Sequence, residues 1–268
     1  MRFLSGAIAA LVIVGAVPSV SHAAAGDHIV RAKAAKPRPV DVSDAAVPGV
    51  SRGAAAKAER AGDDAADLVA ELPARRTDDF GLVGVTWARG FDDSGMTVQV
   101  RLRTKGAWSS WRDLDVETDA GEGGRDGTEP LWAGVADGVG VRVTSPTGTP
   151  PEDLRVSTID AGTTPETASA TADSFATSAT DGSPAYTPRP SSSSRAAGGA
   201  KKITDCDAPR TGNETRGVIV HHTAGSNNYT AGQSASIFRA TQAYHMKALD
   251  WCYICYNLLV DKYGQIFE

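Results

Sequence analysis

The chain has 268 residues, which allows one large domain or two modest ones, and its 28 glycines and 14 prolines suggest folded pieces separated by linkers. Its hydrophobic fraction is 41% and its formal net charge at pH 7 is −5. This acidic balance, without a basic face of interleaved aromatic residues, argues against nucleic acid as a partner and favours solubility.

Residues 1–23 have the pattern of a secretory signal peptide. Arg2 supplies the positive start, residues 4–17 form an apolar run, and residues 21–23 offer a cleavage site flanked by small residues. A membrane anchor is the alternative, but the run is shorter than the roughly 20 residues that a spanning helix needs. We therefore expect a secreted, extracellular protein with no stable membrane anchor after cleavage.

Residues 24–75 are rich in Ala, Asp, Lys and Arg and contain almost no aromatic side chain. This composition predicts a disordered or weakly helical pro-segment. A helix over residues 54–72 is possible, with a thin apolar stripe of Leu68, Val69 and Leu72.

Residues 76–162 are predicted to form an all-β, sandwich-like accessory domain. Short strands are expected at residues 82–87, 96–103, 114–116, 139–143 and 154–159, with turn sequences between them. Five or more short strands at this spacing are typical of a β-sandwich. Four tryptophans are expected to pack in the core or between strands, with a sugar-binding platform as the alternative: Trp87, Trp108, Trp111 and Trp132.

Residues 163–201 are rich in Ser, Thr, Ala and Pro and are predicted to be a disordered linker. From residue 202 the pattern changes. A β-branched run at residues 217–220 predicts a central strand, residues 233–249 a helix capped by Ser234, residues 256–260 a second strand, and residues 265–268 a third after a turn. This order predicts the first half of an α/β domain, with a mixed sheet and helices, over residues 202–268.

A histidine pair, His221 and His222, ends the first of these strands. From the residues alone, such a pair fits either structural histidines or a metal site. Neighbouring residues of a strand point to opposite faces, so a single metal would not take both. His245 in the helix and Tyr256 in the second strand are likewise open to a packing role or a functional one.

Three sequence blocks in this region resemble the zinc amidases of the peptidoglycan recognition protein family, the type 2 N-acetylmuramoyl-L-alanine amidases. They are VIVHHTAG at residues 218–225, YHMK at residues 244–247 and YNLLVDKYGQIFE at residues 256–268. They occur in the family's order and cover about the last quarter of the chain. The β-rich region before them is similar to an accessory module of secreted actinobacterial amidases.

The resemblance implies Zn²⁺ as cofactor, peptidoglycan as partner and substrate, and hydrolysis of the amide between muramic acid and L-alanine. His221 matches a zinc ligand, and Tyr256 matches the tyrosine that stabilises the developing oxyanion or positions the water. Residues expected to line the substrate site are His222, Thr223, His245 and Asn257. The expected location is the extracellular cell wall.

The family's other zinc ligands would lie beyond Glu268. We therefore expect a truncated amidase domain that holds zinc poorly and is catalytically incomplete. A peptidoglycan-binding module without catalysis is the alternative from another functional class. An unstable gene fragment without a folded C-terminal domain is a third possibility.

The three cysteines fit a secreted protein with one disulfide. A bridge between Cys206 and Cys252 is the favoured pairing, and one between Cys252 and Cys255 is the runner-up. The family usually has glycine at the position of Cys255, which predicts an unusual backbone angle or a close approach there.

Overall fold

A computed structural model describes residues 38–51, 67–117, 124–163, 191–200, 214, 217–223 and 225–268. The chain divides into two compact units, residues 1–34 and residues 35–268, and everything described belongs to the second. The predicted signal peptide lies outside the described residues. Within the described part, no helix combines the length and apolar character needed to cross a membrane.

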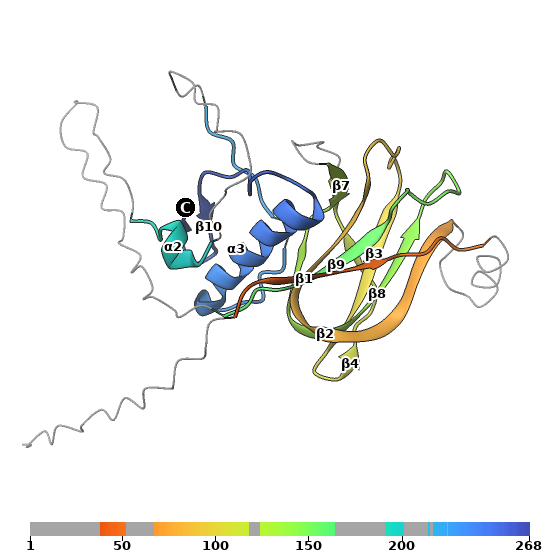
Figure 1. The fold of residues 1–268 in the computed structure, drawn as a ribbon, viewed down its shortest axis with the longest axis horizontal. Coiled ribbons are helices and arrows are strands. Elements are labelled where there is room, and N and C mark those ends of the chain that lie inside the picture. The colour runs from red at the N-terminus through yellow and green to blue at the C-terminus, as the bar shows by residue number, and fades with distance from the viewer. Residues whose placement is uncertain are drawn as a thin grey trace, which may run out of the picture. The chain divides into compact units, whose positions relative to one another are not determined.

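The second unit is dominated by one nine-stranded sheet in which every strand pair is antiparallel. The main path runs β1-β9-β2-β8-β3-β4 (Figure 1). Strand β5 pairs with β3, and β7 joins β2 to β6. The strands are β1 (Asp41–Ala46), β2 (Leu68–Ala88), β3 (Thr97–Thr104), β4 (Ala107–Trp108), β5 (Arg112–Leu114), β6 (Val116–Glu117), β7 (Arg125–Thr128), β8 (Leu131–Thr144) and β9 (Arg155–Asp160). The predicted β-rich architecture is confirmed as antiparallel sheet.

Strands β2 and β8 are long enough to take part in two layers. Their pairing contains several register shifts, and such bulges let a strand bend. Both halves of β2 contribute to a single buried cluster, so the sheet folds over on itself around one core. The inner side chains from the three central strands are Leu72, Val83, Val85 and Trp87 of β2, Val98, Val100 and Leu102 of β3, and Val139, Val141 and Val143 of β8.

The second half of β2 is buried on both faces. Residues 80–87 of this strand are all buried. Because successive side chains of a strand alternate between faces, Val83, Val85 and Trp87 point into the inner core, and the residues between them point to the outer face. Leu82 belongs to a separate outer cluster that includes helical residues. The continuous apolar run in the sequence reflects this double burial.

The tryptophans act as packing residues. Trp87 and Trp132 are buried. The Arg101 guanidinium lies 5.4 Å from the ring centroid of Trp108 and 5.5 Å from that of Trp111. Arg142 lies 4.5 Å from the Trp111 ring. Cation–π stacking therefore occupies these half-buried rings, which favours the packing role over a sugar platform.

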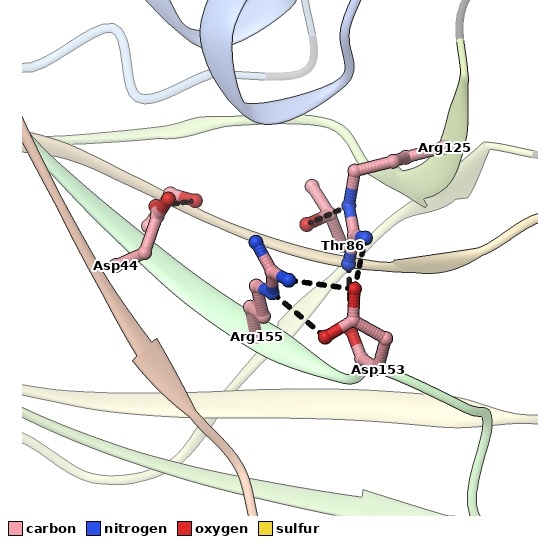
Figure 2. A network of polar contacts seen from close by, with 6 residues as sticks. Asp44, Thr86, Arg125, Asp153 and Arg155 are labelled. Atoms are coloured by element: carbon pink, nitrogen blue, oxygen red, sulfur yellow. Dashed lines mark hydrogen bonds and ion pairs between the residues drawn. The ribbon is translucent and has the colours of Figure 1, made fainter.

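Two arginines, Arg125 of β7 and Arg155 of β9, meet at the Asp153 carboxylate and link β2, β7 and β9 (Figure 2). Asp153 accepts hydrogen bonds from Arg155 at 2.8 Å and from Arg125 at 2.6 Å, and Arg125 also donates to Thr86 Oγ1 at 3.2 Å. Bonds from Arg155 and then Arg125 lower the pKa of the Asp153 carboxyl. Since Asp153 is exposed, solvent screens these pairs, and their main effect is to orient side chains.

The folded β-rich region begins before residue 76, where the sequence predicted it to start. Strand β1 and the start of β2 both lie within residues 24–75, where a disordered or helical segment was predicted. Residues 68–72 are in β2, so the C-terminal end of the predicted helix over residues 54–72 is wrong. The apolar residues of that thin stripe, Leu68, Val69 and Leu72, are buried core residues of the sheet.

The end of the predicted linker is also structured. Residues 191–200 include the short helix α2 (Arg195–Gly198). Ser193 donates its N–H to Ile266 O at 2.8 Å and accepts the N–H of Glu268 at 3.0 Å, forming a parallel bridge to the last strand. The linker prediction is therefore wrong for residues 191–200. Residues 164–190 lie outside the described residues.

The C-terminal segment contains the predicted helix. A 3₁₀ turn, η1 (Ala231–Gln233), leads into α3 (Ser234–Ala243) and a π-helical turn, η2 (Tyr244–Ala248). The N-terminal capping box is formed by Thr230 and Gln233 rather than by Ser234. A short hairpin of β10 (Leu259–Val260) and β11 (Ile266–Phe267) follows.

The strand predicted at residues 217–220 is not formed. Val218, Ile219 and Val220 are 85–95% exposed, and the segment has no regular secondary structure. A buried central strand needs neighbours on both edges and cover on both faces, and none of the described strands pairs with this segment. The α/β sheet predicted for residues 202–268 therefore stays a prediction.

Candidate functional site

His221 and Tyr256 lie together although they are far apart in the sequence. Tyr256 Oη is 3.2 Å from His221 Nδ1, which is hydrogen-bonding distance. Their rings are nearly parallel, with an interplanar angle of 17° and centroids 6.2 Å apart. His221 is exposed and Tyr256 is partly exposed, so both present polar atoms to solvent. We call this arrangement the His221–Tyr256 pair.

Two other histidines of the described residues flank this pair differently. The His222 ring centroid is 5.7 Å from that of His221, and His222 is exposed. His245 is only 4% exposed, with its centroid 6.1 Å from that of Tyr256. Its Nδ1 lies 3.2 Å from Ile254 O, and its ring centroid lies 4.5 Å from that of Trp251. His245 thus lies near Tyr256 on its buried side, whereas His222 enlarges the exposed surface beside His221.

Two further residues predicted to line the site are less closely engaged. Thr223 is partly buried and follows the histidine pair directly in the chain. Asn257 is exposed and follows Tyr256. The structure thus gathers His221, His222, His245 and Tyr256 by ring contacts, and it places Thr223 and Asn257 on the adjoining backbone.

Cys252 is disulfide-bonded, and Cys255 keeps an exposed thiol. A bridge between Cys252 and Cys255, the runner-up pairing, is therefore absent. Cys206, the favoured partner, lies outside the described residues.

Cys255 adopts the left-handed backbone region, with a φ of 63°. This conformation brings Cβ close to the following carbonyl oxygen, at a cost of roughly 1–2 kcal/mol for a residue with a side chain. The unusual backbone angle expected from the resemblance is therefore present, directly before Tyr256. The protein holds a cysteine where glycine would be unstrained.

Replacing Cys255 by glycine is expected to stabilise the backbone around Tyr256 by about 1 kcal/mol, because glycine removes the left-handed penalty. Native-state hydrogen exchange of the amides at residues 252–258 would measure this local change. The matched control is Cys255→Ala, which removes the thiol but keeps Cβ, and it should bring no gain. Equal stabilisation by both variants would assign the effect to the thiol instead.

Asp261 is a site residue that the sequence analysis treated only as part of a turn. It is 7% exposed and accepts a hydrogen bond from the hydroxyl of Ser234, the first residue of α3, at 2.5 Å. It also accepts the backbone N–H groups of Tyr263 and Gln265, both at 2.8 Å. An aspartate that caps its own turn is a recognisable sequence signal, but its bond to the helix start is not. Asp261 fixes the hairpin to the start of α3, which continues into the η2 turn that carries His245.

A second set of contacts fastens the polar loop of residues 225–230 to the same hairpin. Lys262 Nζ donates to Asn227 O at 2.6 Å and lies 4.7 Å and 4.9 Å from the ring centroids of Tyr229 and Tyr263. The Tyr263 hydroxyl donates to Tyr229 O at 2.8 Å. Because this loop follows Thr223, these contacts restrain the segment on which the histidine pair lies.

The described residues do not fit a zinc site. Across the ranges that the structure describes, no group of three or more His, Cys, Asp or Glu side chains is placed to hold a metal ion. Two other imidazoles lie near the pair: His222 is exposed beside His221, and His245 is buried with its Nδ1 3.2 Å from the Ile254 carbonyl. A catalytic zinc needs about three protein ligands. The His221–Tyr256 pair offers one imidazole and one phenol.

Comparison with known families identifies the β-rich part of the chain. The family model described as Rv3811 N-terminal galactose-binding domain-like matches residues 31–179, more than half of the chain. The chain belongs to this family. The matched range includes β1 and all of β2, in agreement with the earlier start of the domain seen in the fold. This galactose-binding-like domain is called the β domain below.

Part of the chain is similar to peptidoglycan recognition proteins. The chain is 42% identical over 57 residues to peptidoglycan-recognition protein SC1a/b of Drosophila simulans, covering 21% of this chain and 31% of that protein. It is 34% identical over 65 residues to peptidoglycan recognition protein 1 of Mus musculus, covering 24% and 35% of the two chains. The chain thus spans about a third of the length of these curated relatives. No solved structure matches it.

Proposed function

We propose that this protein is secreted and binds peptidoglycan through the exposed surface around the His221–Tyr256 pair. The observation that carries the proposal is the contact between His221 Nδ1 and Tyr256 Oη, because it joins two of the sequence blocks that resemble the peptidoglycan recognition family. The similarity to relatives named for peptidoglycan recognition supports the same class of ligand.

The chemistry of this surface suits a glycopeptide. An imidazole and a phenol each combine a flat apolar ring with polar atoms at the edge, so they can pack on a sugar or peptide and also hydrogen-bond to it. His222 and Asn257 add exposed donors and acceptors beside the pair. Such a surface recognises hydroxyl and amide groups without requiring a charged ligand.

Amide hydrolysis is the second candidate function. It is favoured by the same contact, because the resemblance gives His221 the role of a zinc ligand and Tyr256 that of an oxyanion or water partner. In this reading Zn²⁺ would supply an activated water when bound. The described residues do not supply the necessary ligand set, so binding is the function that the geometry supports better.

Sedimentation with insoluble cell walls tests the proposal. The full chain is expected to be retained equally well with and without a metal chelator, and His221→Ala should weaken retention about tenfold or more by removing one side of the pair. Tyr256→Phe should weaken it less, because the ring remains. Val135→Ala is the control, since it removes an exposed side chain of β8 and leaves the pair and its supporting contacts intact, and it should bind normally.

Two outcomes contradict binding as the main function. Failure of the unsubstituted chain to sediment with cell walls would remove the proposal. Release of amines from purified cell walls at a rate abolished by both chelator and His221→Ala would instead favour the amidase.

A further inference from the structure

On the outer face of the β domain, one aromatic side chain packs directly against the backbone of a glycine. We call this packing position on Gly84 the seat. Gly84 of β2 lies between Leu82 and Thr86 on this face. A Cβ at position 84 would overlap the ring carbons and hydroxyl oxygen of Tyr244, the first residue of the π-helical turn η2. Tyr244 is completely buried. The tyrosine ring therefore fills the space that a side chain at position 84 would occupy.

A second glycine continues the seat on the neighbouring strand. Gly127 of β7 pairs with Thr86 of β2, and a Cβ on Gly127 would lie 2.8 Å from Leu249 Cδ2. Leu249 closes η2, and its N–H donates to Tyr244 O at 3.0 Å. Both ends of one π-helical turn thus pack over glycines of adjacent strands.

The seat also favours an aromatic residue that carries a hydroxyl group, that is, tyrosine over phenylalanine. The ladder between β2 and β7 does not extend past the pair of Thr86 and Gly127, and the N–H of Val85 donates to Thr128 Oγ1 at 3.1 Å instead. The Tyr244 hydroxyl lies 2.8 Å from Thr128 O and 3.3 Å from Val85 O, to which it can donate. A buried hydroxyl without a partner is unfavourable, so these carbonyls fix the orientation of the tyrosine.

The seated turn leads directly to the candidate site. His245 follows Tyr244, and its ring lies against Trp251 and within 6.1 Å of the Tyr256 ring centroid. Tyr256 in turn contacts His221. π-Helical turns are rare and are frequently found at functional sites. Tyr244, which is anchored on the sheet, is therefore the sequence neighbour of His245, the side chain that supports the His221–Tyr256 pair.

We propose that the β domain is the positioning support of the candidate site, and that Tyr244 seated over Gly84 is the positioning residue that transmits this support. The proposal rests on the proposed peptidoglycan binding and assigns the β domain a part in it. In this role the β domain contacts no ligand. It holds η2 so that His245 keeps Tyr256 beside His221.

A double-mutant cycle in the full chain tests this proposal. Gly84→Ala should displace Tyr244, raise the exchange rate of the Leu249 amide at least tenfold, and weaken cell-wall retention about tenfold. In a Tyr244→Ala background the methyl group added at position 84 has room, so Gly84→Ala should have no further effect on either measurement. Tyr244→Phe keeps the ring and loses the hydroxyl, and it should weaken retention by a smaller factor.

A control variant separates positioning from general stability. Val141→Ala, in the inner core of β8, destabilises the β domain without touching the seat. At temperatures well below its melting point, Val141→Ala should retain normal cell-wall binding and normal Leu249 exchange. Equal losses in Val141→Ala and Gly84→Ala would overturn the positioning role.

The possible failures are distinguishable. Cell-wall binding that survives Gly84→Ala while Leu249 exchange accelerates contradicts this inference and leaves the proposed function intact. Unchanged Leu249 exchange in Gly84→Ala contradicts the seat itself. Absence of binding by the unsubstituted chain contradicts the proposed function, whereas the exchange data still report whether Tyr244 is seated.

Discussion

Replacing Trp87 by alanine is expected to lower the free energy of unfolding of the β domain by about 3–5 kcal/mol, the usual range for removing a buried aromatic side chain. Trp87 is fully buried at the end of β2 and belongs to the inner core with Val85 and Val98. Its deletion leaves a cavity that the surrounding sheet cannot close. Urea unfolding followed by circular dichroism measures the loss.

The same substitution at Trp111 is the control for Trp87. Trp111 is half-buried and is held by stacking with Arg101 and Arg142 rather than by enclosure. Trp111→Ala should therefore cost only about 1–2 kcal/mol, the sum of two exposed cation–π contacts and some packing. Similar losses at both positions would mean that Trp87 is not in a closed core.

Replacing Asp261 by alanine is expected to destabilise the C-terminal segment by about 2–4 kcal/mol. The substitution removes the acceptor for two backbone N–H groups and for the buried Ser234 hydroxyl. A hydrogen bond to a charged group contributes about 1.5–3 kcal/mol, and water replaces part of the loss where the freed N–H groups become exposed. The hairpin should then separate from the start of α3. Hydrogen exchange of the α3 amides measures this loosening.

Asp261→Asn provides the matched control for that experiment. Asparagine keeps one side-chain oxygen in the position of Oδ1, which accepts both backbone N–H groups, so it should recover more than half of the lost stability. If Asp261→Asn were as damaging as Asp261→Ala, negative charge rather than hydrogen-bond acceptance would be the important property. An unchanged α3 in both variants would show that Asp261 is not a link between hairpin and helix.

The inner core of the β domain was predictable because alternation has a simple geometric cause. Strands such as residues 96–103 place every second side chain on one face, and the structure confirms these strands. The start of the domain was missed because residues 68–72 are also compatible with a helical stripe. Only pairing with β8 decides between the two, and pairing is a long-range property.

The C-terminal segment shows the same limit. Helix α3 was predictable from local periodicity. The strand predicted at residues 217–220 does not form, because β-branched residues only favour extended, covered backbone and do not determine whether a neighbouring strand is there to pair with it.

For the site, the importance of His221 and Tyr256 came from resemblance to a family, and their contact is visible only in three dimensions. Asp261 and Tyr244 were missed as linking residues because each acts across more than 25 positions of sequence: Asp261 on Ser234 and Tyr244 on Thr128. The local sequence around a turn aspartate or a helical tyrosine does not indicate such a distant partner. For the same reason, the sequence around Gly84 does not indicate that a tyrosine ring packs on it.

The serine- and proline-rich stretch before residue 201 marks an apparent border between two modules, yet the hydrophobic cluster on the outer face of the sheet ignores that border. Leu82, Trp132 and Ile159 from one side share this cluster with Ala240 and Tyr244 from the other. Cutting the gene at the serine stretch would therefore divide a single folding unit. Each piece would then expose the apolar side chains that it contributes to the shared cluster. A protein expressed to study the C-terminal segment should therefore also contain the residues of the β-sheet.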